Sequence, residues 1–363
     1  NLAFVLGQRG DGDETVLRAL EVAMEIATRL GLRGREVGAA FEAAGRLLQR
    51  AERHDDAIAA LESACDRDPG SGSAQASLGR VLVAVARYED ALARTRRAVE
   101  LEPLVTEHLD LLALHLRRMG RNAEAAEIYA QWMKLDPDNP IPAHMHLALT
   151  GAPAPETANL DYVRREFDVF AERFDEVLRT RLEYRAPELV LQATHDALGA
   201  ETRELDIADL GCGTGLCGPL LRPLARRLVG VDLSPEMLAR AAGRGYDELV
   251  DGDLAGFCSA HPMEFDLLVA ADVFVYIGAL VPVLEAAHTS LRARGFFVFT
   301  IERSSGESEN FHLTPGGRYA HAEPYARRCL DASGFDIVSA TNAPLRTELR
   351  VPVLGTVFVA RAR

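Results

Sequence analysis

Residues 209–215 read DLGCGTG and place three glycines, Gly211, Gly213 and Gly215, at every second position. The apolar run LDIADL leads into this segment and the helical pattern LCGPLLRPLA follows it. Such a loop lies at the carboxyl end of a strand, where parallel sheets bind ligands. Glycine has no Cβ, so the backbone can pass close beneath a bound molecule. We therefore predict a ligand-binding loop, with Asp209 orienting its backbone.

Two common nucleotide loops do not fit these residues. No Gly-Lys-Ser or Gly-Lys-Thr follows the glycines, which excludes a Walker loop. Leu216 occupies the third glycine position of the dinucleotide fingerprint, so an NAD-dependent dehydrogenase is the less favoured alternative. The remaining pattern suits a nucleoside that carries an amino acid, because no helix N-terminus is committed to a pyrophosphate.

Acidic residues after the next two strands are suited to such a nucleoside. Asp232 ends LVGVD, 21 residues beyond Gly211, where a carboxylate can accept hydrogen bonds from both ribose hydroxyls. In the later DGDL, Asp253 can accept from an adenine amino group, and the backbone NH of Leu254 can reach a ring nitrogen. We therefore predict one binding site built from three successive strand ends.

Short apolar runs that alternate with helical patterns must position these residues. The runs lie at 205–210, 228–232, 265–271 and 295–301, with a further short one around Leu249 and Val250. This alternation predicts a parallel sheet covered on both faces by helices. Near the end of the chain, FDIVSA and VLGTVFVARA predict a final antiparallel pair.

The first half of the chain contains a repeat. Pro69, Pro103 and Pro137 are each 34 residues apart, and Gly45 aligns with Gly79. Small residues in both helices and a proline after the second are typical of tetratricopeptide repeats. The predicted segments are repeats at about 1–35, 36–69, 70–103 and 104–137, a capping helix at 140–150 and a stiff linker at 151–156. We expect the concave groove of such a stack to contact a protein partner, the substrate or a second copy of the chain.

The amino-acid composition of the chain argues against several classes of function. The net charge is −14, which does not favour nucleic acid as a partner. Lys134 is the only lysine, so a Schiff-base lysine is nearly excluded, and the arginine bias indicates a GC-rich genome. The five cysteines lack zinc-site spacing, so we expect reduced thiols, a cytoplasmic location and no metal. The sequence contains no apolar run of about 18 residues and no charged leader, so we predict neither a membrane span nor a signal peptide.

From residue 157 onward the sequence resembles the class I S-adenosylmethionine (SAM)-dependent methyltransferases. The segments that carry the resemblance are DYVRREFDVFAERFD, DLGCGTG, VDLSPEML, DGDL, FDLLVAADVFVYIG and GGRYAH. The whole chain resembles the bacterial members that also contain tetratricopeptide repeats. The resemblance implies that residues 157–363 form a Rossmann-like α/β domain with a seven-stranded, mostly parallel sheet. It further implies SAM as cofactor and S-adenosylhomocysteine as product.

The resemblance also implies cofactor contacts. Arg185 would face the SAM carboxylate, Met237 would cover the adenine, and Tyr162 and Phe170 would lie on a lid. Core packing or surface exposure remains the alternative for these four. The other expected contacts are Gly211, Cys212, Gly213, Gly215, Asp232, Leu233, Asp253, Leu254, Ala271, Asp272 and Val273.

The GGRYAH segment is expected to face the methyl acceptor. It brings Arg318, Tyr319 and His321 within four residues, and Asp272 is expected near the transfer zone. An unperturbed histidine could accept a proton from a hydroxyl acceptor near neutral pH, and Arg318 could hold an anionic substrate. Alternatively, His321 caps the next helix and Arg318 pairs with a nearby acid.

The leading hypothesis is methyl transfer from SAM to an oxygen or nitrogen. The acceptor would be a small molecule, a protein or a carrier-bound group. The chain lacks the Asn-Pro-Pro-Tyr motif of enzymes that methylate planar amino groups, which also argues against a nucleic-acid substrate. The alternative from another class is a non-catalytic adaptor that senses SAM and recruits a partner through its repeats.

Overall fold

The structure is a computed structural model that describes residues 13–180, 182–199, 202–306, 308–348 and 351–363. The chain divides into two compact units, residues 1–150 and 151–363. The start of the expected leading repeat, residues 1–12, lies outside the described residues. Each unit has its own apolar core and is described by itself.

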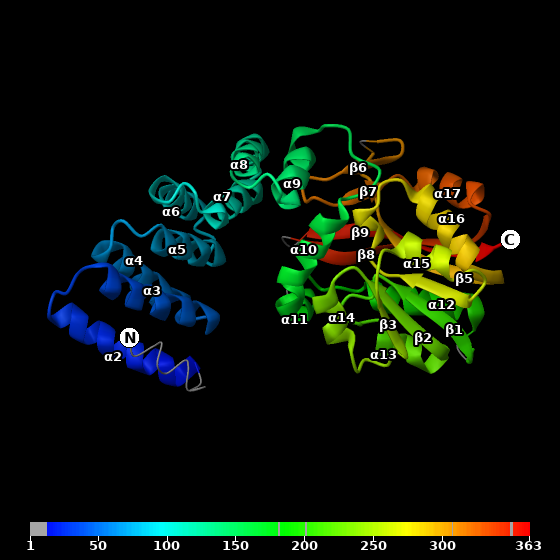
Figure 1. Cartoon of the computed structure of the whole chain (residues 1–363), viewed down its shortest axis with the longest axis horizontal. Coiled ribbons are helices and arrows are strands. Elements are labelled where there is room, and N and C mark those ends of the chain that lie inside the picture. The colour runs from blue at the N-terminus through cyan, green and yellow to red at the C-terminus, as the bar shows by residue number, and fades with distance from the viewer. Residues whose placement is uncertain (1–12, 181, 200–201, 307, 349–350) are drawn as a thin grey trace. The chain divides into compact units, whose positions relative to one another are not determined.

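The first unit is a stack of helices (Figure 1). They are α2 (Asp13–Arg29), α3 (Arg35–Arg50), α4 (His54–Arg67), α5 (Gly72–Ala84), α6 (Tyr88–Leu101), α7 (Thr106–Arg118), α8 (Asn122–Leu135) and α9 (Pro140–Thr150). The pairs α3–α4, α5–α6 and α7–α8 follow the predicted period. The prediction of tetratricopeptide repeats is thereby confirmed.

Two glycines explain how closely the paired helices approach. A Cβ on Gly45 of α3 would lie 2.5 Å from Cγ of Leu61 on α4. A Cβ on Gly79 of α5 would lie 2.6 Å from Oγ1 of Thr95 on α6. Any larger residue would force the helices apart, so the aligned small residues reflect packing.

The second unit is built on a seven-stranded sheet. Its strands are β1 (Leu205–Leu210), β2 (Ala225–Asp232), β3 (Glu248–Asp251), β4 (Phe265–Ala270), β5 (Leu291–Glu302), β8 (Phe335–Glu348) and β9 (Val351–Ala362). Their order is β3-β2-β1-β4-β5-β9-β8, and β9 runs antiparallel to both neighbours. The predicted mostly parallel sheet with a final antiparallel pair is confirmed.

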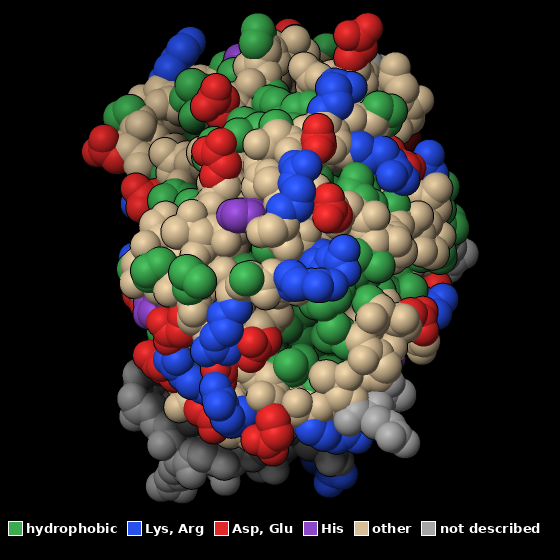
Figure 2. All heavy atoms as spheres, turned by 90° about the vertical axis from the view of Figure 1, so that its right-hand side faces the viewer, with side chains coloured by type: hydrophobic (Ala, Val, Ile, Leu, Met, Phe, Trp, Pro, Cys, Tyr) green, Lys and Arg blue, Asp and Glu red, His purple; other side chains and the backbone are tan. Residues whose placement is uncertain are grey.

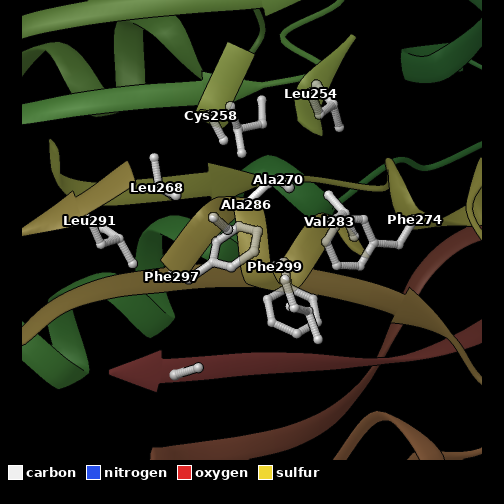
Figure 3. Packing of buried hydrophobic residues seen from close by; sticks show 14 of the residues in the cluster. Leu254, Cys258, Leu268, Ala270, Phe274, Val283, Ala286, Leu291, Phe297 and Phe299 are labelled. Atoms are coloured by element: carbon white, nitrogen blue, oxygen red, sulfur yellow. The ribbon is translucent and has the colours of Figure 1, made fainter. Parts of the chain in front are cut away.

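Alternating strand residues fill two cores on opposite faces of this sheet. The helices that cover it are α12 (Ala186–Leu198), α13 (Gly218–Leu221), α14 (Pro235–Ala241), α15 (Leu254–Ala260), α16 (Leu280–Ser290) and α17 (Glu323–Ala332). Leu268, Ala270, Phe297 and Phe299 belong to the core with α15, α16 and α17 (Figure 3). Val298, between the two phenylalanines, packs with α12 and α13. This alternation is the side-chain period of a strand buried on both faces.

Three short helical segments precede the sheet: α10 (Leu160–Phe170), η1 (Ala171–Arg173) and α11 (Phe174–Thr180). The side chain of Asn159 caps α10 by accepting from the backbone NH groups of Asp161 and Tyr162, at 2.8 and 3.1 Å. The backbone NH of Ala158 donates to the carbonyl of Tyr276 at 3.0 Å. This hydrogen bond therefore connects the start of α10 to the segment that follows β4.

Charged side chains of both signs alternate over the face of the molecule in Figure 2. Among the ion pairs of the second unit, Asp206 pairs with both Arg226 and Arg292. Among the described residues, no helix combines the length and apolar character needed to cross a membrane.

Candidate functional site

A cavity of about 560 Å³ lies at the carboxyl ends of the central strands of the second unit. All of its lining residues fall between Glu156 and Arg346, so the cavity is formed within this unit. The glycine loop, the residues after β2, β3 and β4, and α10 to α11 contribute its walls. This is the edge at which open α/β sheets bind ligands.

The glycine loop turns sharply after β1. The backbone NH groups of Gly211 and Cys212 both donate to the carbonyl of Val231, at 2.7 and 2.9 Å. Gly211 has φ +72°, and a Cβ there would lie 2.6 Å from Val273. Both the backbone conformation and the close approach therefore require glycine.

Asp232 joins this loop to the end of β2. Its Oδ2 accepts from the backbone NH of Gly213 at 2.8 Å, and its Oδ1 accepts from Ser234 at 2.9 Å. Burial raises the pKa of Asp232, and these two backbone donors oppose the shift. The residue lines the cavity, and each oxygen retains capacity to accept a further hydrogen bond.

Asp209, which precedes the glycines, does not line the cavity. It is fully buried, and its Oδ2 accepts from the hydroxyl of Tyr246 at 2.6 Å. Burial raises the pKa of Asp209 to about 7. Its other oxygen, Oδ1, has no hydrogen-bond partner among the described residues, so no such bond supports the predicted role in orienting the loop backbone.

Asp253 and Leu254 line the cavity after β3. Asp253 is the N-cap of α15, and its side chain accepts from the backbone NH of Gly256 at 2.8 Å. Because the cap fixes this turn, it also fixes the carboxylate at the cavity.

The residues after β4 form the next part of the wall. Ala271, Asp272 and Val273 all line the cavity. Asp272 has φ +60°, a left-handed conformation that is uncommon for a residue other than glycine. Its backbone NH donates to Oγ1 of Thr300 at 2.8 Å, which holds the turn.

Five charged residues form a buried ion cluster beside this turn: Asp272, Glu302, Arg318, Arg346 and Glu348. Arg346 donates to Asp272 at 2.7 and 2.8 Å, to Glu348 at 2.6 Å, and also to Glu302. Arg318 pairs with Glu348 and lies 3.8 Å from Glu302. Both arginines line the cavity.

Sequence reasoning missed Arg346, although one signal was present. Arg346 and Glu348 are two residues apart, so they share one face of a strand. The apolar run from which the strand was predicted stops at residue 340, whereas β8 continues to Glu348.

An aromatic row extends along the other side of the cavity. It consists of Phe174, Phe170, Phe167 and Tyr276, all of which line the cavity. Phe174 packs edge-on against Phe170 and Phe167, with ring centroids 5.5 and 6.1 Å apart. Phe167 meets Tyr276 edge-on at 5.3 Å. Since Phe174 also lies 3.8 Å from the Cβ position of Gly213, the row begins at the glycine loop.

Two hydrogen bonds tie the helices that carry this row to the loops beneath. Asp168 accepts from the hydroxyl of Ser234, and Asp175 accepts from the hydroxyl of Thr214, both at 2.5 Å. Asp175 also pairs with Arg244. These contacts hold α10 and α11 against the cavity.

Two of the expected acceptor-side residues do not line the cavity. The fully buried His321 contacts the carbonyl of Ile277 through Nε2 at 2.8 Å, and burial lowers its pKa to about 4. Tyr319 is also fully buried and donates to the carbonyl of Pro155 at 3.0 Å. Both lie on one face of β7 (Tyr319–His321), which pairs with β6 (Phe311–Leu313). That face packs inward, so the expectation of a proton-accepting histidine at the acceptor is corrected.

Four of the expected cofactor contacts also lie off the cavity. Arg185 is an exposed residue at the start of α12, and Met237 is fully buried in α14. Tyr162 is buried in α10 on a face that does not reach the cavity. A Cβ on Gly215 would meet Tyr246 at 2.9 Å, so packing accounts for that glycine. The expected contacts that do line the cavity are Phe170, Gly211, Cys212, Gly213, Asp232, Leu233, Asp253, Leu254, Ala271, Asp272 and Val273.

In the part of the chain that the structure describes, no group of three or more His, Cys, Asp or Glu residues could hold a metal ion. All five cysteines are free and buried. Burial raises the pKa of Cys65 to about 11 and that of Cys258 to about 12, so these two remain thiols at neutral pH.

Comparison with known families matches residues 208–299 to a methyltransferase domain and residues 42–84 and 76–140 to a tetratricopeptide repeat. Human Methyltransferase-like protein 27 is 40% identical over 80 residues, which are 22% of this chain and 32% of that protein. The chain thus matches about a third of the length of that curated relative.

Two solved structures are among those similar to part of this chain. One is 1,6-didemethyltoxoflavin-N1-methyltransferase of Burkholderia thailandensis, with 1,6-didemethyltoxoflavin and S-adenosylhomocysteine bound. It is 22% identical, with a TM-score of 0.46, over 58% of this chain and 93% of that one. The other is magnesium protoporphyrin IX methyltransferase of Synechocystis PCC 6803 with S-adenosylhomocysteine. It is 17% identical, with a TM-score of 0.44, over 56% of this chain and 100% of that one.

The two family matches fall on separate units. The repeat match covers most of α3 to α9, and the methyltransferase match runs from β1 to β5. The second unit therefore contains a methyltransferase domain, and the first unit contains tetratricopeptide repeats.

Proposed function

We propose that the cavity binds SAM and that the enzyme transfers its methyl group to an oxygen or nitrogen of a small-molecule or carrier-bound acceptor. In this proposal Asp232 accepts from the ribose hydroxyls. Asp253 and the backbone NH of Leu254 receive the adenine. The glycine loop passes beneath the methionine portion, with Ala271 to Val273 beside it.

One observation carries the proposal: the ends of four adjacent strands, β3, β2, β1 and β4, supply these groups to a single cavity. A nucleoside that carries an amino acid is an extended ligand, and the groups for its parts follow one another in sheet order. Most of the catalysis would come from alignment of the acceptor atom, the methyl carbon and the sulfur.

The cavity also argues against the adaptor that only senses SAM. Beyond the four strand ends, its wall includes Arg346 on β8, which lies past β4 in the sheet order, and Arg318, which pairs with Glu348 at the end of β8. A cofactor held at β3 to β1 leaves this region for a second molecule. Methyl transfer uses both regions, whereas sensing uses only one.

Calorimetric titration of the full chain with S-adenosylhomocysteine tests the cofactor site. We expect one site per chain, and Asp232→Asn should weaken binding roughly 10- to 100-fold because a charged acceptor for two hydroxyls is lost. Asp247→Asn is the matched control, because Asp247 pairs with Arg222 and does not line the cavity. Equal affinity of the folded Asp232 variant and the wild type would refute the assignment.

The repeats in this proposal bind a partner protein or the carrier of the acceptor. The identified acceptor can be offered to the full chain and to residues 151–363. If the repeats bind the carrier, the shorter chain should show a raised KM with little change in kcat.

A further inference from the structure

The position of the proposed cofactor site determines where the acceptor must enter. The proposed adenosine contacts lie at β3 and β2, and the glycine loop follows β1, so in this proposal the methyl group would lie toward β4 and the strands beyond it. Asp272 follows β4, Glu302 ends β5, and Arg346 lies near the end of β8. The strand β8 runs parallel to β5, because β9 is antiparallel to both. The buried ion cluster therefore lies on the acceptor side.

This cluster carries more negative than positive charge. It contains three carboxylates and two guanidinium groups, which gives a formal charge of −1 when all five are ionised, although burial raises the pKa of Glu302. Three of its side chains are little exposed, at 3% for Arg346, 13% for Glu302 and 14% for Asp272, whereas Arg318 and Glu348 are partly exposed. Glu166 on α10 adds a further carboxylate to the cavity wall. Charges in such a water-poor site act more strongly on a ligand than they would at the surface.

The carboxylates of the cluster engage all three nitrogens of Arg346, whereas Arg318 is only partly engaged. Nη1 of Arg346 donates to both oxygens of Asp272, its Nη2 to Glu302 and its Nε to Glu348. Arg318 donates to Glu348. Although burial alone would raise the pKa of Glu348, these two arginines hold it below the ordinary value, so the carboxylate stays ionised. An acceptor carboxylate or phosphate at Arg346 would have to displace an existing partner, and at Arg318 it would lie beside the ionised Glu348.

The aromatic row leads from the glycine loop to this cluster. Its last member, Tyr276, is close enough to Asp272, Arg318, Arg346 and Glu166 for their charges to influence its pKa, which burial raises to about 12. The faces and edges of four rings supply an apolar wall for an acceptor body. Aromatic faces also attract ammonium groups. Excess negative charge and aromatic rings together favour a cation.

We propose that the acceptor is an amine on an apolar, ring-bearing body, which binds as an ammonium ion beside the buried ion cluster. This inference rests on the proposed methyl transfer. The ammonium first releases a proton to solvent, and the nitrogen lone pair then forms the new N–C bond. The C–S bond breaks as its electron pair stays on sulfur. The products are an N-methylammonium ion and neutral S-adenosylhomocysteine.

Matched pairs of probes with opposite charge test this inference. The full chain is first saturated with S-adenosylhomocysteine. It is then titrated with phenethylamine against hydrocinnamate, and with tryptamine against indolepropionate, by calorimetry or ligand-observed NMR. In each pair the ring and chain are similar and the charged group differs. We expect each amine to bind at least about tenfold more tightly than its carboxylate partner.

Two substitutions should shift this preference in opposite directions. Arg318→Gln makes the cluster more negative and should raise the amine preference about fivefold, whereas Glu348→Gln should lower it by a similar factor. Both side chains are partly exposed, at 26% and 32%, so the variants should fold, which circular dichroism can verify. Arg327→Gln is the control, because this arginine pairs with Glu323 on α17 and does not line the cavity.

The outcomes separate the two proposals. If S-adenosylhomocysteine fails to bind, both the proposed function and the inference about the acceptor are refuted. If it binds but the carboxylates bind as well as the amines, or neither class binds, the amine acceptor is wrong while the cofactor site stands. Shifts of the same sign in both cluster variants would also contradict the charge argument.

Discussion

Arg346 Nη1 donates hydrogen bonds of 2.7 and 2.8 Å to the two carboxylate oxygens of Asp272. The arginine comes from the end of β8, at the edge of the sheet, and the aspartate follows β4. The ion pair therefore brings together the ends of two strands between which β5 and β9 lie in the sheet order. This ion pair ties the C-terminal strands to the turn at which Asp272 adopts φ +60°.

Arg346→Leu should destabilise the fold strongly. Burial opposes the charge of this arginine, but Asp272, Glu302 and Glu348 raise its pKa above the ordinary value. Removing it leaves buried carboxylates without their donor, at a cost of about 3–5 kcal/mol. Urea denaturation measures the loss. Arg226→Gln, which removes a largely exposed partner of Asp206, should leave the midpoint almost unchanged.

Gly211→Ala should cost more stability than Gly243→Ala. Both glycines have positive φ, +72° and +84°, so each alanine carries about 1 kcal/mol of backbone strain. Only at Gly211 does the new Cβ collide with Val273, whereas nothing lies within 4 Å at Gly243. Thermal unfolding of both variants separates the two effects. Equal losses would show that the contact with Val273 does not constrain the loop.

The sequence predicted the architecture well because its signals were local. The 34-residue period, the apolar runs of the strands and the glycine loop each depend on neighbouring residues. The order of glycine loop, Asp232 and Asp253 also predicted three neighbouring positions along the cavity, since parallel strands end at one edge.

The acceptor side was harder to predict because it depends on contacts far apart in sequence. Arg346 meets Asp272 across 74 residues and Glu302 across 44. The density of polar residues in GGRYAH suggested an acceptor site. In the structure this segment pairs as a strand, and the side chains of Tyr319 and His321 are buried. No local pattern distinguishes which residues of such a short strand face inward.

His321 should make stability depend on pH. Burial lowers its pKa from 6.5 to about 4 in the folded state. Between these values the unfolded chain binds the proton more readily, so the contribution of His321 is present above pH 6.5 and is lost as pH falls toward 4. The difference is at most about 3 kcal/mol.

Urea denaturation of the wild type and His321→Gln at pH 7.5 and pH 5 measures this effect. The wild type should lose more stability than the variant on acidification, because glutamine does not titrate. The same loss in both proteins would mean that other groups cause the pH dependence.

A chain that begins at residue 151 should retain the cofactor affinity of the full chain. Every residue that lines the cavity lies between Glu156 and Arg346, and the second unit has its own cores. Titration of both chains with S-adenosylhomocysteine should give dissociation constants within about twofold. A folded shorter chain with much weaker binding would mean that the repeats contribute to the site.

The central claim is that SAM lies across the strand ends of this cavity. A crystal structure of the full chain with S-adenosylhomocysteine tests it most directly. We predict the ribose hydroxyls at Asp232, the adenine at Asp253 and Leu254, and the sulfur directed toward Asp272 and the aromatic row. Ligand density at another place, or a ribose that does not contact Asp232, would contradict the account.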